Sequence, residues 1–245
     1  DPSSKTHVLL ISGREKPRYI KYYATPLERL HDLPPGISDD RLITENIENI
    51  RKSVRSGIGV GDEEILLLMV GSGFETKGLD RSLGAVSGLP DRLRKKTKLV
   101  VIGRGKTKPF EHMARRLRIF ERLIFLGGRD DVPRFMVSAD LLLHPARSEN
   151  TGTVLIEAMA AGLPVLATDV CGYAFYVSAA RAGLLIPSPF EQRSFNELLR
   201  QMLESPEREA WKHNGMTYVS RNDFFSMPEK AADVIESLAK KANPR

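Results

Sequence analysis

Two acidic residues, Glu149 and Glu157, flank the start of a predicted helix and are separated by seven residues. Glu149 falls in the loop after a short apolar strand, and Glu157 falls about a turn and a half into the helix. The backbone amides of Thr151, Gly152 and Thr153 lie at the helix start, where N–H groups have no intrahelical partner. Such amides favour a phosphate or a sugar hydroxyl, and glycine allows a close approach. The alternative is that both acids are solvent-exposed, as most are.

A glycine-rich turn with one lysine follows the apolar run Ile65–Val70 and extends from Gly71 to Gly78. Lys77 lies where a helix is predicted to start, a position at which the helix dipole disfavours a cation. A bound diphosphate would remove that penalty, although Lys77 could equally be a solvated loop cation. The spacing of glycines and lysine differs from that of the phosphate-binding loop of nucleoside triphosphatases.

Three other features have ordinary structural explanations. His144 ends a predicted strand, where a packed or capping histidine is more common than a catalytic base. Trp211 lies on an amphipathic helix and is predicted to be in the core. A basic run is typical of a solvated helix face, and attraction to an anionic membrane surface is the alternative; it comprises Arg92, Arg94, Lys95, Lys96 and Lys98.

The elements that must position these residues alternate between short apolar strands and helices, which predicts βαβ units and a parallel sheet. We therefore expect an α/β fold, a Rossmann-like doubly wound sheet with ligands at the carboxyl ends of its strands. The strands are expected at 65–70, 99–102, 123–126, 141–144, 165–168 and 184–186, and the helices at 77–89, 110–120, 132–139, 152–161, 194–203, 207–219 and 229–240.

Composition limits the class of protein. The 245 residues are 41% hydrophobic and 28% charged, which is typical of a folded domain. The longest apolar run is six residues, too short for a membrane-spanning helix, and the first residues are polar. A single cysteine, Cys171, excludes an intramolecular disulfide and favours the cytosol. The net charge of +6 favours anionic partners weakly, so nucleotide phosphates, an anionic membrane and nucleic acid all stay open.

The first 60 residues differ from the remainder. Residues 8–11 could form a strand but have no evident sheet, and the segment 33–37 reads as a rigid proline-containing linker. We expect the chain to be the C-terminal part of something longer. The expected division is a remnant at 1–32, a Rossmann-like domain at 33–223 and a C-terminal helical segment at 224–245.

A nicotinamide-dependent oxidoreductase is disfavoured. The turn Gly103-Arg104-Gly105 follows a strand but lacks the third glycine of the dinucleotide fingerprint.

Taken together, the motifs resemble the nucleotide-sugar domain of retaining glycosyltransferases with the GT-B fold, glycosyltransferase family four. The resemblance rests on the Gly71–Gly78 loop, on the turn at 103–105, on residues 139–145, and on the Glu149–Glu157 pair followed by Ala158–Val165. Within the family, residues 33–37, 80–82, 170–173 and 228–233 are similar to bacterial glucosyltransferases that add glucose to a heptose of the lipopolysaccharide core.

The resemblance implies a role for each matching residue. Lys77 and Arg41 would bind the diphosphate of a UDP-sugar, and Lys77 and Glu149 would take part in catalysis. Glu157 would accept hydrogen bonds from the ribose, and the loop at Arg129 would contact the uracil through its backbone. Glu149 would hold the donor sugar, and the backbone amides of Thr151, Gly152 and Thr153 would contact sugar and phosphate. Gly71 would also bind the donor.

The implied chemistry requires no cofactor and no metal, because the chain has no Asp-x-Asp motif and cations would stabilise the departing UDP. Two departures are evident: Ser72 stands where the family has an arginine, and Thr76 where the similar glucosyltransferases have one. The expected partners are UDP-glucose or another UDP-sugar, a lipopolysaccharide acceptor bound by the other half, and no nucleic acid. The expected location is the cytoplasm, peripheral to the inner membrane.

Two alternatives to that activity stay open. The chain could hold a nucleotide sugar without transferring it, or it could serve another sugar or acceptor. Alone, it is expected to bind donor and to transfer little or nothing.

Overall fold

The structure is a computed structural model that describes residues 4–43 and 45–242; the polar start at 1–3 lies outside the described residues. The chain divides into two compact units, which are considered separately. The larger unit covers residues 40–220, and the smaller combines the residues up to 39 with those from 221 onward.

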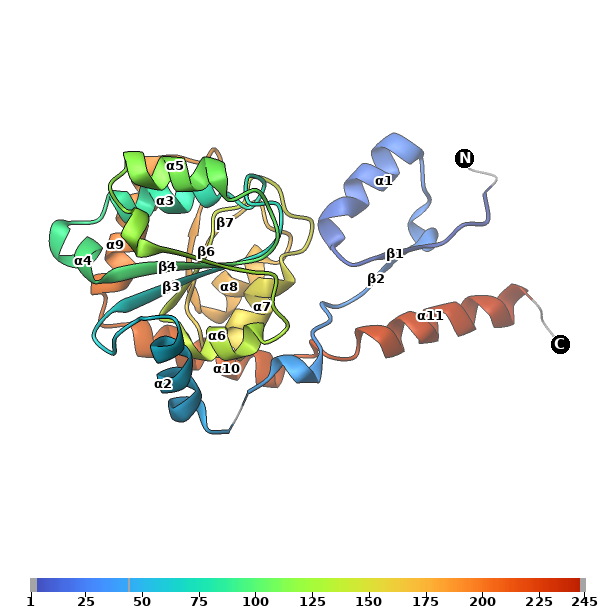
Figure 1. The fold of residues 1–245 in the computed structure, drawn as a ribbon. Coiled ribbons are helices and arrows are strands. Elements are labelled where there is room, and N and C mark those ends of the chain that lie inside the picture. Colours follow the sequence, from blue (N-terminus) through green and yellow to red (C-terminus); the bar gives the residue numbers. More distant parts are fainter. Residues whose placement is uncertain (1–3, 44, 243–245) are drawn as a thin grey trace. The chain divides into compact units, whose positions relative to one another are not determined.

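The larger unit is built on a six-stranded parallel sheet with the strand order β5-β4-β3-β6-β7-β8 (Figure 1). The chain runs outward from β3 to one edge and then returns to β6, so the topological switch point lies between these two strands. Ligands bind at such a point in doubly wound folds. Six residue pairs register β3 with β4, but only two register β3 with β6. The strands are β3 (Ile65–Val70), β4 (Thr97–Ile102), β5 (Leu123–Gly127), β6 (Leu141–His144), β7 (Val165–Thr168) and β8 (Gly183–Ile186).

Helices cover both faces of this sheet, with α3, α5 and α9 on one face and α6, α7 and α8 on the other (Figure 1). The helices of the unit are α2 (Ile47–Gly57), α3 (Leu79–Ser87), α4 (Asp91–Lys96), α5 (Lys108–Arg116), α6 (Val132–Ser138), α7 (Thr153–Ala160), α8 (Ala174–Ala180), α9 (Gln192–Glu204) and α10 (Arg208–Arg221).

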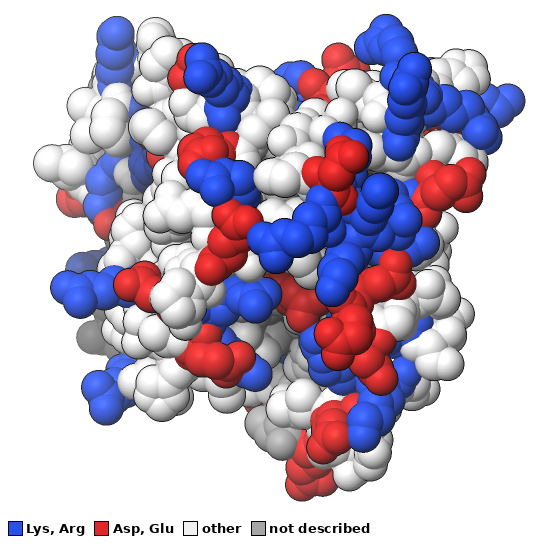
Figure 2. All heavy atoms as spheres, turned by 90° about the vertical axis from the view of Figure 1, so that its left-hand side faces the viewer, with Lys and Arg blue, Asp and Glu red and all other residues white. Residues whose placement is uncertain are grey.

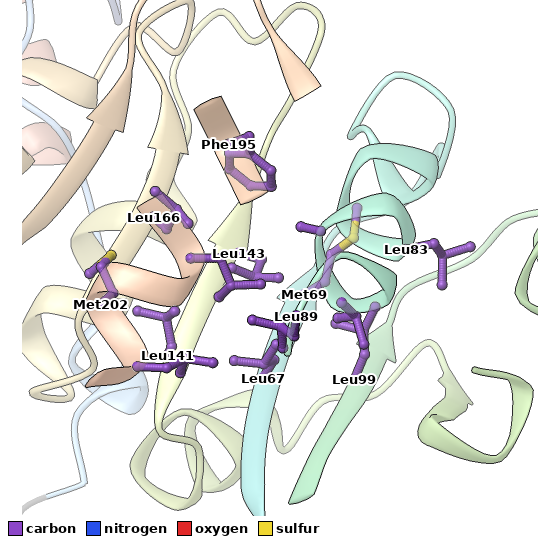
Figure 3. Packing of buried hydrophobic residues seen from close by; sticks show 14 of the residues in the cluster. Leu67, Met69, Leu83, Leu89, Leu99, Leu141, Leu143, Leu166, Phe195 and Met202 are labelled. Carbon is purple, nitrogen blue, oxygen red and sulfur yellow. The ribbon is translucent and has the colours of Figure 1, made fainter. Parts of the chain in front are cut away.

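The core explains why the strands read as continuous apolar runs. Both faces of a covered parallel sheet are buried, so successive strand residues must all be apolar. The four central residues of β3, from Leu66 to Met69, are fully buried. Figure 3 shows Leu67 and Met69 of β3 in one apolar cluster with Leu83 of α3 and Phe195 of α9. Each such side chain contributes roughly 1.5–3 kcal/mol by burial, so this layer fixes α3 and α9 against the sheet.

Most predicted elements are present, and the differences have local causes. Helix α3 begins at Leu79, two residues later than expected, because Gly78 adopts a left-handed conformation with φ of 75°. Helix α4 lies within the predicted basic run, and α8 was not predicted. Both are short and carry too few periodic apolar residues to signal a helix. Trp211 is buried, as predicted, and Cys171 is buried as well.

The smaller unit contains β1 (Val8–Leu10), β2 (Leu30–Asp32), α1 (Lys16–Tyr23) and α11 (Met227–Ala242). The expectation of a strand without a sheet is wrong, because β1 pairs in parallel with β2. In this unit the amide of Ile37 donates to the carbonyl of Phe224, with 2.8 Å between nitrogen and oxygen. Among the described residues, no helix has both the length and the apolar character needed to cross a membrane.

Candidate functional site

Lys77 and Glu149 form an ion pair at the carboxyl edge of the sheet. Lys77 lies in the loop after β3 and Glu149 in the loop after β6, so the pair bridges the switch point. The ammonium of Lys77 donates to Oε2 of Glu149. Only 21% of the lysine side chain and 14% of the glutamate side chain are exposed, so the alternative of solvent-exposed residues is wrong in this structure.

The two loops approach each other because Gly78 has no side chain. A Cβ atom at residue 78 would lie 2.0 Å from the carbonyl oxygen of Pro145, well inside contact distance. Its φ of 75° is also one that other residues rarely adopt. The amide of Arg147 then donates to the carbonyl of Thr76 at 2.8 Å, which joins the loops directly. The backbone of these loops therefore sets the separation of Lys77 from Glu149.

Two residues at the start of α3 reinforce this junction. The guanidinium of Arg81 donates to the carbonyls of Pro145 and Ala146 at 3.1 and 3.2 Å. The carboxylate of Asp80 receives two hydrogen bonds from Arg147, at 2.8 and 2.7 Å. Burial alone would raise the pKa of Asp80, but the bonds and charge of Arg147 outweigh it and hold that pKa below its ordinary value.

Glu149 also lies beside His144, the last residue of β6. Nε2 of His144 is 3.4 Å from Oε2 of Glu149, close enough for electrostatic attraction but outside hydrogen-bond geometry. This contact with His144, opposed by burial and assisted by the Lys77 ammonium, lowers the pKa of Glu149 to about 2. The carboxylate is therefore ionised at neutral pH and can accept hydrogen bonds from a ligand.

The start of α7 lies immediately beyond Glu149. Gly152 caps the helix in a left-handed conformation with φ of 87°, and it provides no side-chain capping hydrogen bond. The loop is held by a bridge between Glu149 and Cys171 and by a 2.7 Å hydrogen bond from the amide of Tyr173 to the carbonyl of Thr151. The free amides at the helix start, beginning at Thr153, can bind an anion or a hydroxyl oxygen.

Glu157 lies in the second turn of α7, with 17% of its side chain exposed. Burial raises the pKa of Glu157, and the charge of Arg41 opposes that shift. Nε of Arg41 is 3.9 Å from Oε1 of Glu157. A half-buried carboxylate beside a guanidinium forms a polar subsite that is separate from the Lys77–Glu149 pair.

Two further predicted site residues have different surroundings. A Cβ on Gly71 would lie 3.2 Å from Cε of Lys77, so this glycine leaves room for the lysine chain. Arg129 follows β5 and is engaged with Asp131, with nitrogen–oxygen distances of 2.7 and 2.8 Å. The contacts of its side chain within the described residues therefore do not include the Lys77–Glu149 pair.

Sequence reasoning missed the supporting residues Arg81 and Arg147, and it assigned no role to His144 at the site. A charged residue in a loop gives no signal of its partner when that partner is some 67 positions away, as for Arg147 and Asp80. For His144, the position at a strand end just before Glu149 could have suggested proximity. In the described part of the chain, no group of three metal-ligating side chains is present.

Two of the five basic residues in the run on and after α4 pair with acidic side chains. Arg94 pairs with Asp91 in the same helix, and Arg92 pairs with Glu204 of α9 at 3.1 Å. Figure 2 shows blue and red atoms interspersed over this side of the molecule, with one larger blue group. The arrangement favours the solvated-face interpretation of the run.

A sheet with the Rossmann strand order and a lysine–glutamate pair at its switch point defines a nucleotide-binding type of domain. The family model of glycosyl transferases group 1 matches residues 50–217, so the chain belongs to this glycosyltransferase family, as predicted.

Among curated relatives, lipopolysaccharide glucosyltransferase WaaG of Escherichia coli K12 is 44% identical over 236 residues, covering 96% of this chain and 63% of WaaG. The crystal structure of WaaG superimposes with a TM-score of 0.91, covering 95% of this chain and 63% of that one. The match confirms the predicted fold class, the C-terminal half of a GT-B glycosyltransferase. The chain spans less than two thirds of the length of these relatives.

More distant relatives share the fold. D-inositol 3-phosphate glycosyltransferase of Jonesia denitrificans is 30% identical over 176 residues, covering 67% of this chain and 41% of its own length. Anabaena HepE, solved in complex with UDP-glucose, is 21% identical with a TM-score of 0.81, covering 95% of this chain and 64% of HepE.

Proposed function

We propose that the chain is the donor-binding half of a retaining, UDP-sugar-dependent glycosyltransferase. Joined to an acceptor-binding half, it transfers glucose to a heptose of the lipopolysaccharide core in the bacterial cytoplasm. The observation that carries the proposal is the Lys77–Glu149 pair, which places one cation and one carboxylate at the switch point. The 44% identity to WaaG supports glucose and the lipopolysaccharide acceptor.

The diphosphate of the donor takes the place of Glu149 at the Lys77 ammonium. Negative charge grows on UDP as the sugar–phosphate bond breaks, and cations that face the departing group lower the barrier. Arg41 supplies the second cation, and the amides from Thr151 to Thr153 at the start of α7 add the positive end of the helix dipole. No metal and no cofactor enter this scheme.

The nucleoside and the sugar occupy the two carboxylate subsites. Glu157 accepts hydrogen bonds from both ribose hydroxyls, and the backbone around Arg129 contacts the uracil. Glu149, ionised because its pKa is about 2, accepts hydrogen bonds from hydroxyls of the donor sugar. Its role is to hold the sugar while the acceptor hydroxyl attacks, with retention of the anomeric configuration as in the family.

Calorimetry tests the proposal directly. The chain is titrated with UDP, UDP-glucose, UDP-galactose and NAD, with and without EDTA. The proposal expects binding of UDP and UDP-glucose, no binding of NAD and no effect of EDTA. Lys77→Ala should abolish most of the UDP signal, whereas Lys95→Ala, which removes an exposed lysine from α4, should not change it. A chain that binds NAD and not UDP would refute the proposal.

A further inference from the structure

His144 is buried at the end of β6 in a way that hydrogen bonding in the free protein does not explain. Its side chain is about 1% exposed, and neither ring nitrogen has a hydrogen-bond partner within the described part of the chain. Leaving a buried donor unpaired is costly, and native structures rarely do so without a reason. The unpaired Nε2 faces Oε2 of Glu149 at 3.4 Å.

The same oxygen is the one that Lys77 holds in the free protein. A carboxylate oxygen has two lone pairs and can accept from both groups. Among the described residues, the recorded side-chain partners of the Glu149 carboxylate are Lys77 and His144. If Lys77 turns toward a diphosphate, His144 is the recorded side-chain partner that Oε2 of the largely buried Glu149 carboxylate keeps among the described residues.

The protonation state of His144 allows its ring to donate a hydrogen bond to Glu149. Burial lowers the pKa of His144, and Lys77 adds to that effect while Glu149 opposes it. The ring is therefore neutral, with one nitrogen that carries a proton and one that does not. The negative oxygen beside Nε2 favours the tautomer in which Nε2 carries the proton.

The backbone around His144 and Glu149 is held in place, so a change in their separation would have to come from the side chains. Arg81 holds the carbonyls of Pro145 and Ala146, directly after His144, and Arg147 is fastened to Asp80. The loop between His144 and Glu149 is thus fixed to α3. A hydrogen bond between the two residues would therefore come from movement of the Glu149 side chain toward Nε2 of His144, which is 3.4 Å away.

We propose that His144 is a positioning residue that takes Glu149 over from Lys77 when a donor binds. Lys77 then faces the diphosphate, and Nε2–H of His144 donates to Oε2 of Glu149 and aims Oε1 at the hydroxyls of the sugar. This inference rests on the proposed function, because it requires a diphosphate at Lys77 and a sugar at Glu149. His144 itself touches neither part of the donor.

The first test separates the sugar from the nucleotide. His144→Leu replaces the imidazole by an apolar side chain and so removes the hydrogen-bond donor at Nε2. His144→Gln keeps an N–H near the position of Nε2. We expect His144→Leu to weaken UDP-glucose by about tenfold more than UDP, the loss of one hydrogen bond to a charged group. His144→Gln should recover most of that difference. His112→Leu, at an exposed histidine of α5, is the control and should change neither affinity. Equal losses of UDP and UDP-glucose in His144→Leu would mean a merely structural role.

The second test follows the ring nitrogens of the wild-type chain, and a variant serves only to assign the signal of His144. The chain is labelled with ¹⁵N-histidine, and the ring nitrogens are followed by NMR as UDP and then UDP-glucose are added; the signal absent in His144→Gln identifies His144. We expect a neutral ring with a protonated Nε2, whose proton moves downfield and exchanges slowly with UDP-glucose. An unprotonated Nε2 in that complex would overturn the inference but leave the proposed function intact. A chain that bound neither nucleotide would overturn both.

Discussion

Arg147 donates two parallel hydrogen bonds to Asp80, and this contact helps to join the helix that follows the Lys77 loop to the loop that carries Glu149. Side chains from sequence positions far apart are thereby held in a fixed relation before any ligand arrives. Preorganisation of this kind lowers the entropy that a ligand would otherwise have to remove on binding.

The first prediction concerns that contact. Arg147→Lys keeps the charge but cannot form the two-pronged bond. With the Arg147 and Asp80 side chains 39% and 31% exposed, solvent screens the pair, so we expect a loss of about 1 kcal/mol in the free energy of unfolding. UDP affinity should fall as well, because the two loops are held less firmly. Urea denaturation and calorimetry measure the two effects. The matched control is Arg200→Lys on the exposed face of α9, which should not change the affinity for UDP. Unchanged UDP affinity in Arg147→Lys would mean that the Arg147–Asp80 contact does not influence the binding site.

The second prediction distinguishes the diphosphate from the nucleoside. Lys77→Ala should weaken UDP by about 2 kcal/mol, in the range of one hydrogen bond to a charged group, and leave uridine nearly unchanged. Only UDP carries the charge that the ammonium neutralises. Competition calorimetry can compare the two ligands in the same variant. If both ligands lost the same amount, Lys77 would act through the fold and not through the phosphates.

The third prediction is that Glu157→Gln raises the stability of the protein and lowers its affinity for UDP. Burial raises the pKa of Glu157, which means that its charged form is held at a cost in the free protein. Glu157→Gln removes the charge at nearly constant volume and should raise the free energy of unfolding by up to about 1 kcal/mol. The same variant should weaken UDP by about 1–3 kcal/mol, because the ribose hydroxyls lose a charged acceptor. Thermal unfolding with and without UDP shows both. A variant with lower stability and unaltered UDP binding would contradict the ribose assignment.

The fourth prediction concerns acid stability. Burial holds the pKa of His144 below its ordinary 6.5. As pH falls below 6.5, the unfolded chain takes up a proton at this residue and the folded chain does not. The free energy of unfolding therefore decreases by up to about 1.4 kcal/mol per pH unit from this residue alone, until the folded pKa is reached. The lowered pKa of Glu149 acts in the same direction, but between 4.5 and about 2.

Urea denaturation at a series of pH values measures this dependence. His144→Leu should show a flatter decline than the wild type between pH 6.5 and 4.5, and His112→Leu should keep the wild-type slope. Groups common to both proteins, such as Glu157, cancel in the comparison. An unaltered slope in His144→Leu would mean that the ring takes up its proton normally in the folded chain.

The sheet was predictable from the sequence because a buried parallel strand must be apolar along its whole length. A short continuous apolar run such as Ile65–Val70 fits few other structures than a buried strand. The parallel pair of β1 and β2 was not predicted, since three-residue strands carry almost no periodic signal. The candidate site followed the same division. Glu149 and Lys77 were predicted because strand ends converge in such a sheet, whereas the grip of Arg147 on Asp80 depends on side-chain geometry that spacing does not encode.

The short pairing between β3 and β6 has a consequence for how a bound donor would stabilise the domain. Among the described residues, the register pairs of these two strands are Leu67 with Leu141 and Leu68 with Leu142, and Lys77 and Glu149 lie in the loops that follow the two strands. A nucleotide sugar with its diphosphate on Lys77 and its sugar on Glu149 would straddle the line between these strands like a cross-link. A bound donor would then increase the resistance of the domain to separation of the two halves of its sheet at this line.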